Sequence, residues 1–135
     1  MKTLVRTHSV NKVLLVDDNP AQLSVREAVL RKAGFEVSLA TTVESALATL
    51  RVLRGSIGVV VTDHLMPGGS GLDLVRQLRI SDNWVAVIVL SGMPEAEAEY
   101  HGLGVIFRPK PLPPPELIEL VRASLAKACP SEGAA

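Results

Sequence analysis

The sequence predicts an α/β protein in which a five-stranded parallel sheet carries helices on both faces. Short apolar runs alternate with stretches of helical periodicity five times along the 135 residues, as in repeated strand–helix–strand units. Several of these runs are continuously apolar, as expected for strands that are buried on both faces. Because crossover connections are right-handed, few strand orders remain. At this length the doubly wound, flavodoxin-like order 2-1-3-4-5 is favoured.

Each predicted strand is an apolar run bounded by turn residues. The second run alternates in polarity, which indicates a strand with one more polar face, near the edge of the sheet. The third run is apolar up to Thr62 and the fourth is apolar throughout, as expected for strands buried on both faces. The strands are expected at residues 12–16, 35–40, 57–62, 85–90 and 105–107.

The helices are located by their caps and by the helical spacing of their apolar residues. Asn19 before Pro20 offers a side-chain cap and a proline at the first helical position, and Gly34 suits the C-terminal end of the same helix. Thr41 and Glu44 have the spacing of a capping box for the next helix. The helices are expected at residues 20–33, 41–55, 70–80, 95–101 and 115–128.

Composition narrows the class of protein. Hydrophobic residues make up 47% and aromatic residues 3% of the chain, so the core is aliphatic. Fourteen basic residues balance fourteen acidic ones, which favours neither nucleic acid nor a membrane surface as the main partner. The single Cys129 excludes an internal disulfide, and no apolar stretch reaches the ~20 residues of a membrane span. We expect a cytoplasmic domain at residues 12–128, with tails at 1–11 and 129–135.

Chemically active side chains follow four of the five predicted strands. These are Asp17 and Asp18 after the first strand, Asp63 after the third, Ser91 after the fourth and Lys110 after the fifth. Parallel strands end at one edge of a sheet, so these side chains are expected to converge there. Taken singly, each has a simpler role: a turn cap, acids at a helix start, a turn hydroxyl or a solvated charge.

The converging residues suit phosphoryl chemistry. Three carboxylates repel one another, and a divalent cation that prefers oxygen ligands, Mg²⁺ or Mn²⁺, resolves the repulsion. Asp63 can then act as a nucleophile toward a phosphoryl group and form an aspartyl phosphate. The metal and the Lys110 ammonium neutralise the phosphoryl oxygens, and the Ser91 hydroxyl can donate a hydrogen bond to one of them.

This pattern resembles the receiver domain of two-component response regulators over residues 13–125. That family has an acidic pair after the first strand, an acceptor Asp after the third, Ser or Thr after the fourth and Lys-Pro after the fifth. The matching residues are Asp17-Asp18, Asp63, Met66-Pro67, Gly71, Ser91, Phe107 and Lys110-Pro111.

The resemblance implies a phosphoryl acceptor that signals through protein contacts and is not a turnover enzyme, apart from a possible autophosphatase activity. The donor is expected to be a histidine kinase or a phosphotransfer protein, and the downstream protein is unknown. Asp18, Asp63 and the Leu65 carbonyl are expected to ligate the metal, with Asp17 acting mainly through water.

The resemblance also implies a switch in which Ser91 moves toward the phosphoryl group and Phe107 rotates inward. Pro67 and Gly71 are expected to shape the turn after the acceptor, and the peptide bond before Pro111 is expected to be cis.

Three features depart from the family pattern. The segment from Ser91 to Lys110 is short by about one helical turn, so the fourth helix is expected to be stunted or irregular. Pro113 stands where many members carry a side-chain cap. The sequence ends soon after its last helix, so no output domain is expected in this chain. A receiver cut from a hybrid histidine kinase, or a pseudo-receiver that works without phosphorylation, therefore remains an alternative.

Two other classes share parts of this pattern. A phosphohydrolase of the haloacid-dehalogenase type needs a second acid two residues after the nucleophile, where this chain has Leu65. A flavodoxin-like FMN binder needs a phosphate cradle of Ser, Thr and Gly after the first strand. Asp17 and Asp18 stand in that loop and would repel the phosphate.

Overall fold

The computed structural model describes residues 12–66 and 68–128 and contains a five-stranded parallel sheet. Its order is β2-β1-β3-β6-β7, which is the predicted order 2-1-3-4-5 when the strands of this sheet are counted along the chain. The predicted fold class is therefore confirmed. The strands are β1 (Lys12–Val16), β2 (Glu36–Ala40), β3 (Ile57–Asp63), β6 (Ala86–Ser91) and β7 (Val105–Pro109).

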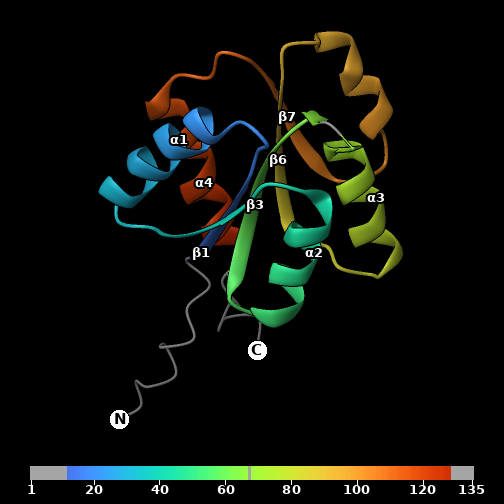
Figure 1. Ribbon diagram of the computed structural model, residues 1–135, viewed down its shortest axis with the longest axis horizontal. Helices are drawn as coiled ribbons and strands as arrows, with labels where there is room; N and C mark the ends of the chain where they lie inside the picture. Colours follow the sequence, from blue (N-terminus) through green and yellow to red (C-terminus); the bar gives the residue numbers. More distant parts are fainter. Residues whose placement is uncertain (1–11, 67, 129–135) are drawn as a thin grey trace.

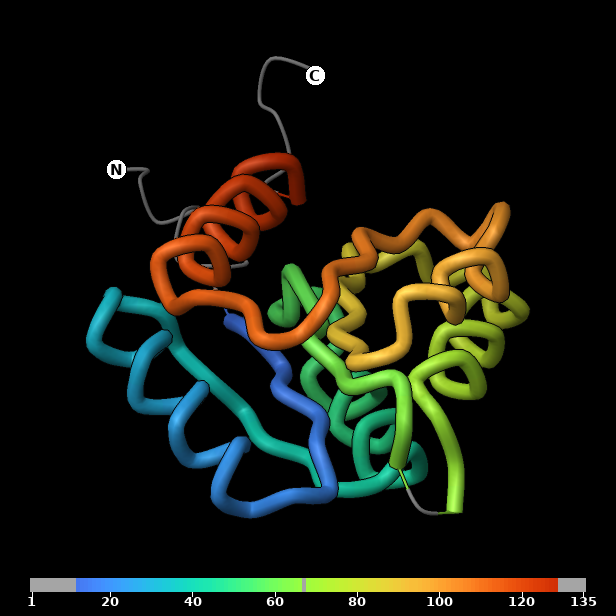
Figure 2. Tube along the Cα trace, turned by 90° about the horizontal axis from the view of Figure 1, so that it is seen from above, coloured from blue at the N-terminus to red at the C-terminus, as the bar shows by residue number. Residues whose placement is uncertain are grey.

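Helices cover both faces of this sheet, with α1 and α4 on one face and α2 and α3 on the other (Figures 1 and 2). A small antiparallel hairpin separates β3 from α3. These elements are α1 (Pro20–Lys32), α2 (Val43–Val52), β4 (Leu65–Met66), β5 (Gly69–Ser70), α3 (Gly71–Ile80), the 3-10 helix η2 (Pro94–Tyr100) and α4 (Pro114–Ala128). Pro67, Cys129 and the two predicted tails lie outside the described residues.

The central strand β3 is buried along all seven of its residues. Its apolar side chains point alternately to the two faces of the sheet, as the period of a strand requires. Val60 belongs to the hydrophobic cluster under α2 and α3, whereas Val59 and Val61 belong to the cluster under α1 and α4. The continuous apolar run therefore contributes to both cores and places Asp63 at the end of a fully buried strand.

The N-termini of the first three helices are closed by side-chain caps. Asn19 accepts hydrogen bonds from the backbone N–H groups of Ala21 and Gln22 at the start of α1, as predicted. The predicted capping box of Thr41 and Glu44 is wrong. Thr42 caps α2 instead, and Ser45 completes the box. Two adjacent threonines offer the same cap, and spacing alone does not choose between them.

The segment between β6 and β7 is short and irregular, as the sequence predicts. It forms the 3-10 helix η2, which buries Ala96 and Tyr100 against the sheet. The Arg79 guanidinium fastens the following loop by donating to the carbonyl oxygens of Leu103 at 2.7 Å and Gly104 at 3.2 Å. This attachment sets the start of β7, the strand that leads to Lys110.

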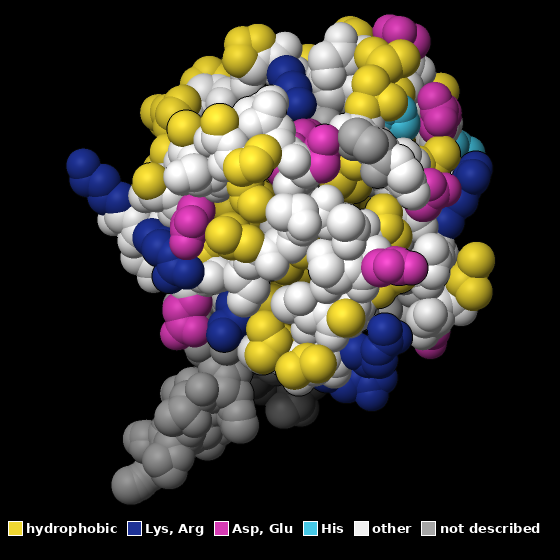
Figure 3. Space-filling view, viewed as in Figure 1, with side chains coloured by type: hydrophobic (Ala, Val, Ile, Leu, Met, Phe, Trp, Pro, Cys, Tyr) yellow, Lys and Arg dark blue, Asp and Glu magenta, His cyan; other side chains and the backbone are white. Residues whose placement is uncertain are grey.

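Acidic and basic side chains are interspersed over the face of the molecule drawn in Figure 3. This distribution agrees with the formal net charge of zero. Among residues 12–66 and 68–128, no helix is both long enough and apolar enough to cross a membrane.

Candidate phosphoacceptor site

The sheet brings the predicted residues to one edge because its strands are parallel and adjacent. Asp63 is the last residue of β3 and pairs with Leu90 of β6. Ser91 ends β6 and pairs with Pro109 of β7, and the backbone N–H of Lys110 donates to the Ser91 carbonyl at 2.8 Å. The ends of β1, β3, β6 and β7 thus form a continuous rim.

Three carboxylates meet on this rim. One carboxylate oxygen from each of Asp17, Asp18 and Asp63 lies within 4.8 Å of the other two. Asp17 is fully buried and Asp63 is 3% exposed, whereas Asp18 faces solvent. Carboxylate oxygens at this spacing are the ligands that a hard divalent cation prefers, so the donor set fits Mg²⁺ or Mn²⁺.

Lys110 neutralises one oxygen of the acceptor. Its ammonium lies 3.0 Å from Asp63 Oδ1, and its side chain is about one-third exposed. The peptide bond between Lys110 and Pro111 is cis. The ammonium can therefore contact both the carboxylate and an incoming group from solvent.

Sequence reasoning missed a second cation, Arg26 of α1. Its Nη1 donates to Asp17 Oδ2 at 2.8 Å and lies 3.5 Å from Asp63 Oδ1. The signal was present in the sequence. Arg26 lies three residues after Leu23 and four before Leu30, which are the two core residues of α1. An arginine on the apolar stripe of a helix needs a buried acid as its partner.

Gln22 joins the two cations. Its side-chain oxygen accepts from Arg26 Nη2 at 3.1 Å and from Lys110 Nζ at 3.5 Å. This residue was also missed, because a glutamine in the first turn of α1 gives no sequence signal for contact with a loop 88 residues away.

The environment of Asp63 opposes its ionisation. Burial raises the pKa of its carboxyl from 3.8 to about 6, and a hydrogen bond with Asp17 acts in the same direction. Lys110 and Arg26 lower this pKa, but they do not cancel the effect of burial. Keeping the Asp63 carboxyl ionised without a metal therefore costs free energy, and a bound cation would lower that cost.

The hydroxyl of the predicted switch residue Ser91 is hydrogen-bonded to Met93 and not to Asp63 in this structure. The Ser91 hydroxyl accepts from the Met93 backbone N–H at 2.9 Å and donates to the Met93 carbonyl at 3.3 Å. Phe107 is 7% exposed and packs on Tyr100, with ring centroids 5.8 Å apart. The Leu65 side chain is 62% exposed on the hairpin after the acceptor.

Gly71 lies against the backbone of the acceptor. A Cβ atom at this position would stand 2.4 Å from the Asp63 carbonyl oxygen and 3.2 Å from the Tyr100 hydroxyl. The N–H of Gly71 donates to the His64 carbonyl at 2.9 Å. This close approach allows α3 to begin directly beneath the site.

A buried polar pair links the acceptor to η2. His64, the residue after Asp63, is 6% exposed, and its Nδ1 lies 2.6 Å from the Tyr100 hydroxyl. The two rings also make an edge contact, with centroids 5.5 Å apart. Sequence reasoning did not identify this pair, because its partners come from segments 36 residues apart.

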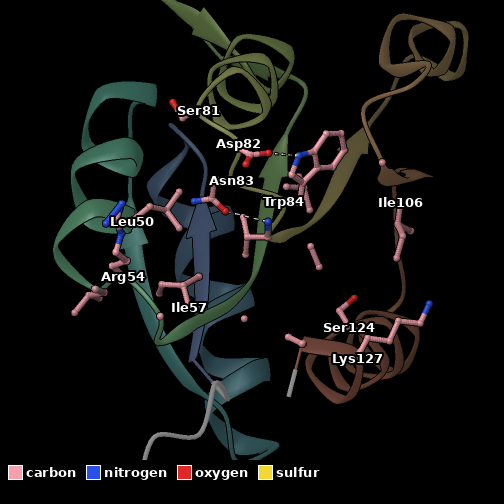
Figure 4. Close-up of a pocket in the computed structure, with 18 of the residues that line it drawn as sticks. Leu50, Arg54, Ile57, Ser81, Asp82, Asn83, Trp84, Ile106, Ser124 and Lys127 are labelled. Carbon is pink, nitrogen blue, oxygen red and sulfur yellow. Dashed lines mark hydrogen bonds between the residues drawn. The ribbon is translucent and has the colours of Figure 1, made fainter. Parts of the chain in front are cut away.

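A cavity of about 770 Å³ lies at the opposite edge of the sheet, between the starts of β3, β6 and β7 (Figure 4). Two of its polar side chains, Asp82 and Asn83, make hydrogen bonds within local turns. Asp82 accepts from the Trp84 indole N–H at 3.2 Å, and Asn83 accepts from the Val85 backbone N–H at 3.0 Å. The carboxylate cluster lies at the other edge, which is the candidate site.

Comparisons with known proteins identify the family of this chain. Residues 13–122 match the family model described as the response regulator receiver domain. The DNA-binding response regulator MtrA of Mycolicibacterium smegmatis is 32% identical over 119 residues, which cover 86% of this chain and 51% of MtrA. The C4-dicarboxylate transport transcriptional regulatory protein DctD of Pseudomonas aeruginosa is 34% identical over 117 residues. These cover 84% of this chain and 25% of DctD.

Solved structures of receiver domains also superpose on this chain. A response regulator receiver protein from Pseudomonas putida superposes with a TM-score of 0.79 and 32% identity, over 85% of this chain and 98% of the other. A response regulator receiver domain protein from Clostridium thermocellum gives a TM-score of 0.79 and 26% identity, over 86% and 94%. The chain spans about a fifth to a half of the length of the curated relatives that it matches.

Proposed function

The chain belongs to the response regulator receiver domains, and from this premise we propose that it accepts a phosphoryl group on Asp63. The donor is a histidine kinase or a histidine phosphotransfer protein, and the reaction depends on Mg²⁺. Domains of this family act in two-component signalling and are generally not turnover enzymes. The observation that carries the proposal is the buried Asp63 carboxylate, clustered with Asp17 and Asp18 and 3.0 Å from the Lys110 ammonium.

The transfer is an in-line displacement at phosphorus. An Asp63 oxygen forms the new P–O bond while the P–N bond to the donor histidine breaks, and the electron pair of that bond stays on the donor imidazole. Lys110 holds its charge beside the oxygens of the transferring group, and Ser91 can donate a hydrogen bond to one of them. Bound Mg²⁺ would supply the remaining positive charge.

The metal would be held by side chains of the rim. Asp18 and Asp63, with the Leu65 carbonyl, are the proposed direct ligands, and Asp17 is proposed to act through water. The raised pKa of Asp63 and the repulsion among three acids both favour occupancy by a divalent cation.

The rim is poorly suited to the alternative chemistries. Residue 65, where a phosphohydrolase of the dehalogenase type needs its second acid, is an exposed leucine. The loop after β1, where a flavin phosphate would bind, carries the acids Asp17 and Asp18. Both observations favour an acceptor aspartate over a hydrolase or a flavin site.

Incubation with acetyl phosphate and Mg²⁺, followed by intact mass measurement, tests the proposal. We expect one phosphoryl adduct in the parent protein. It should not form when a chelator removes Mg²⁺, and it should not form in Asp63→Asn. Asp82→Asn is the matched control, because it makes the same change in a turn at the opposite edge of the sheet, and it should keep the adduct. An adduct that persists in Asp63→Asn would refute the assignment of the acceptor.

A further inference from the structure

Arg26 is a cation in the position where the metal is expected to act. We propose that its guanidinium serves as an internal counter-cation for the acid cluster in the metal-free protein, and that Mg²⁺ binds in competition with it. This inference rests on the proposed function of the site. It makes Arg26 a positioning residue that sets how much Mg²⁺ the chain needs before Asp63 can accept a phosphoryl group.

The geometry of the guanidinium supports competition. One nitrogen, Nη1, spans the two buried acids, 2.8 Å from Asp17 Oδ2 and 3.5 Å from Asp63 Oδ1. These acids are also two of the three residues whose oxygens cluster closely enough to share a cation. An Asp63 oxygen that faces Arg26 and Lys110 has little capacity left for a metal ion.

Charge balance favours the exit of Arg26 when the metal enters. Three carboxylates against Arg26 and Lys110 leave the metal-free cluster with one negative charge. If Mg²⁺ binds while Arg26 stays in place, the cluster has one net positive charge. If Arg26 withdraws as Mg²⁺ binds, the cluster is neutral. In a site this buried, like charges at contact distance are strongly unfavourable.

Arg26 also has room to withdraw. Beside it lies a mostly apolar cavity of about 440 Å³ between α1 and the start of α4, lined by Gln22, Val25, Leu112 and Leu117 among others. The arginine stem can lie along such a surface while the guanidinium turns toward solvent. Its side chain is already 15% exposed, so withdrawal does not require α1 to unfold.

The experiment measures Mg²⁺ affinity in the unphosphorylated full chain by calorimetry, and repeats it with Mn²⁺ by electron paramagnetic resonance. Arg26→Met removes the charge and keeps the length of the stem. We expect it to bind either metal at least about tenfold more tightly, by analogy with the effect of a charge within contact distance on a pKa. Arg76→Met is the matched control on the exposed face of α3 and should leave the affinity unchanged.

Two further variants keep the test decisive if Arg26→Met is too unstable to study. Arg26→Lys keeps the charge but loses the planar fork, and should bind Mg²⁺ with an intermediate affinity. Gln22→Ala keeps the charge and removes one hydrogen-bond partner of the guanidinium, and should tighten binding by about threefold. Without metal, Arg26→Met should melt below the parent, and Mg²⁺ should raise its Tm by more than it raises the parent's.

The outcomes separate the two proposals. Equal or weaker Mg²⁺ binding by Arg26→Met, with a parent that binds normally, overturns the competition and leaves the proposed function intact. A shorter phosphoryl lifetime in Arg26→Met with unchanged metal affinity also overturns it, because Arg26 would then be a ligand of the phosphoryl group. If neither protein binds Mg²⁺, the proposed function fails together with this inference.

Discussion

The two acids after β1 differ more than their adjacent positions suggest. Asp17 is fully buried, accepts from the Asn19 backbone N–H at 2.9 Å and pairs with Arg26, whereas Asp18 is exposed. We expect Asp18→Ala to weaken Mg²⁺ binding more than Asp17→Ala does, because Asp18 is free to act as a direct ligand. Titration of both variants with Mg²⁺ measures the difference. Equal losses, or a greater loss in Asp17→Ala, would contradict the assignment.

Two apolar side chains near the acceptor should limit hydrolysis of the phosphoryl group. Leu65 is 62% exposed and Met93 is 38% exposed, and neither offers a group that could orient an attacking water. Leu65→Asn should therefore lose its phosphoryl group faster than the parent, by about tenfold. Time courses of dephosphorylation by intact mass measure this. Ile80→Asn is the control, because Ile80 is an exposed apolar residue at the end of α3. Equal dephosphorylation rates in the parent and in Leu65→Asn would contradict the prediction.

At the scale of elements, η2 is attached to the rim by two connections. Ser91 hydrogen-bonds to Met93, the residue that precedes η2, and His64 contacts Tyr100, its last residue. Ser91 is a predicted phosphoryl-binding residue, and His64 follows the predicted acceptor Asp63. A change in the position of Ser91 or His64 is therefore transmitted to η2.

The contact between His64 and Tyr100 should stabilise the domain. Burial raises the pKa of the Tyr100 phenol above its ordinary value of 10, and the charges of Glu99 and Asp73 act in the same direction. The stability that this group contributes is present below pH 10 and is lost as the pH rises through the raised pKa of the folded state. Tyr100→Phe leaves His64 without its partner and should cost about 1–3 kcal/mol at neutral pH.

Urea unfolding of parent and Tyr100→Phe between neutral and strongly alkaline pH measures both effects. The chain has a single tyrosine, so its tyrosinate absorbance reports Tyr100 alone. The difference in the free energy of unfolding between the two proteins should shrink above pH 10. A constant difference, or tyrosinate that forms near pH 10 without unfolding, would show that the hydroxyl is accessible.

The sequence predicted the elements that depend on local pattern and missed the contacts that depend on packing. Apolar runs predict buried strands, and residues at their ends predict one shared rim, so Asp17, Asp18, Asp63 and Lys110 could be placed together. The contacts of Gln22 and Tyr100 arise only when α1 and η2 are docked on the sheet. Arg26 was predictable in principle, because an arginine interrupts the apolar stripe of α1.

At the scale of the whole molecule, phosphorylation should be read on the side of the sheet that carries η2. If Ser91 turns toward a phosphoryl group, its hydrogen bonds to Met93 are lost. Phe107 is already buried against Tyr100, so we expect its ring to change its contacts rather than to enter the core from solvent. NMR spectra with and without beryllofluoride and Mg²⁺ should therefore show shifts in the Phe107 ring and in residues 94–108.

Amides of β2, at the far edge of the sheet from β7, provide the internal reference and should shift least. If Ser91 shifts while Phe107 and residues 94–108 do not, the signal leaves the domain by another face.

The close approach of Gly71 to the acceptor backbone also sets which sequences this fold can tolerate. A methyl group there would collide with a backbone carbonyl oxygen of β3, and this strand is buried along its whole length. Gly92, in the turn after β6, has no atom within 4 Å of an added Cβ. A saturation library selected for soluble, folded protein should thus return glycine almost alone at position 71, and alanine and serine freely at position 92. Substitutions should therefore be tolerated at position 92, in the turn beside Ser91, whereas position 71, against the Asp63 backbone, has no space for a side chain.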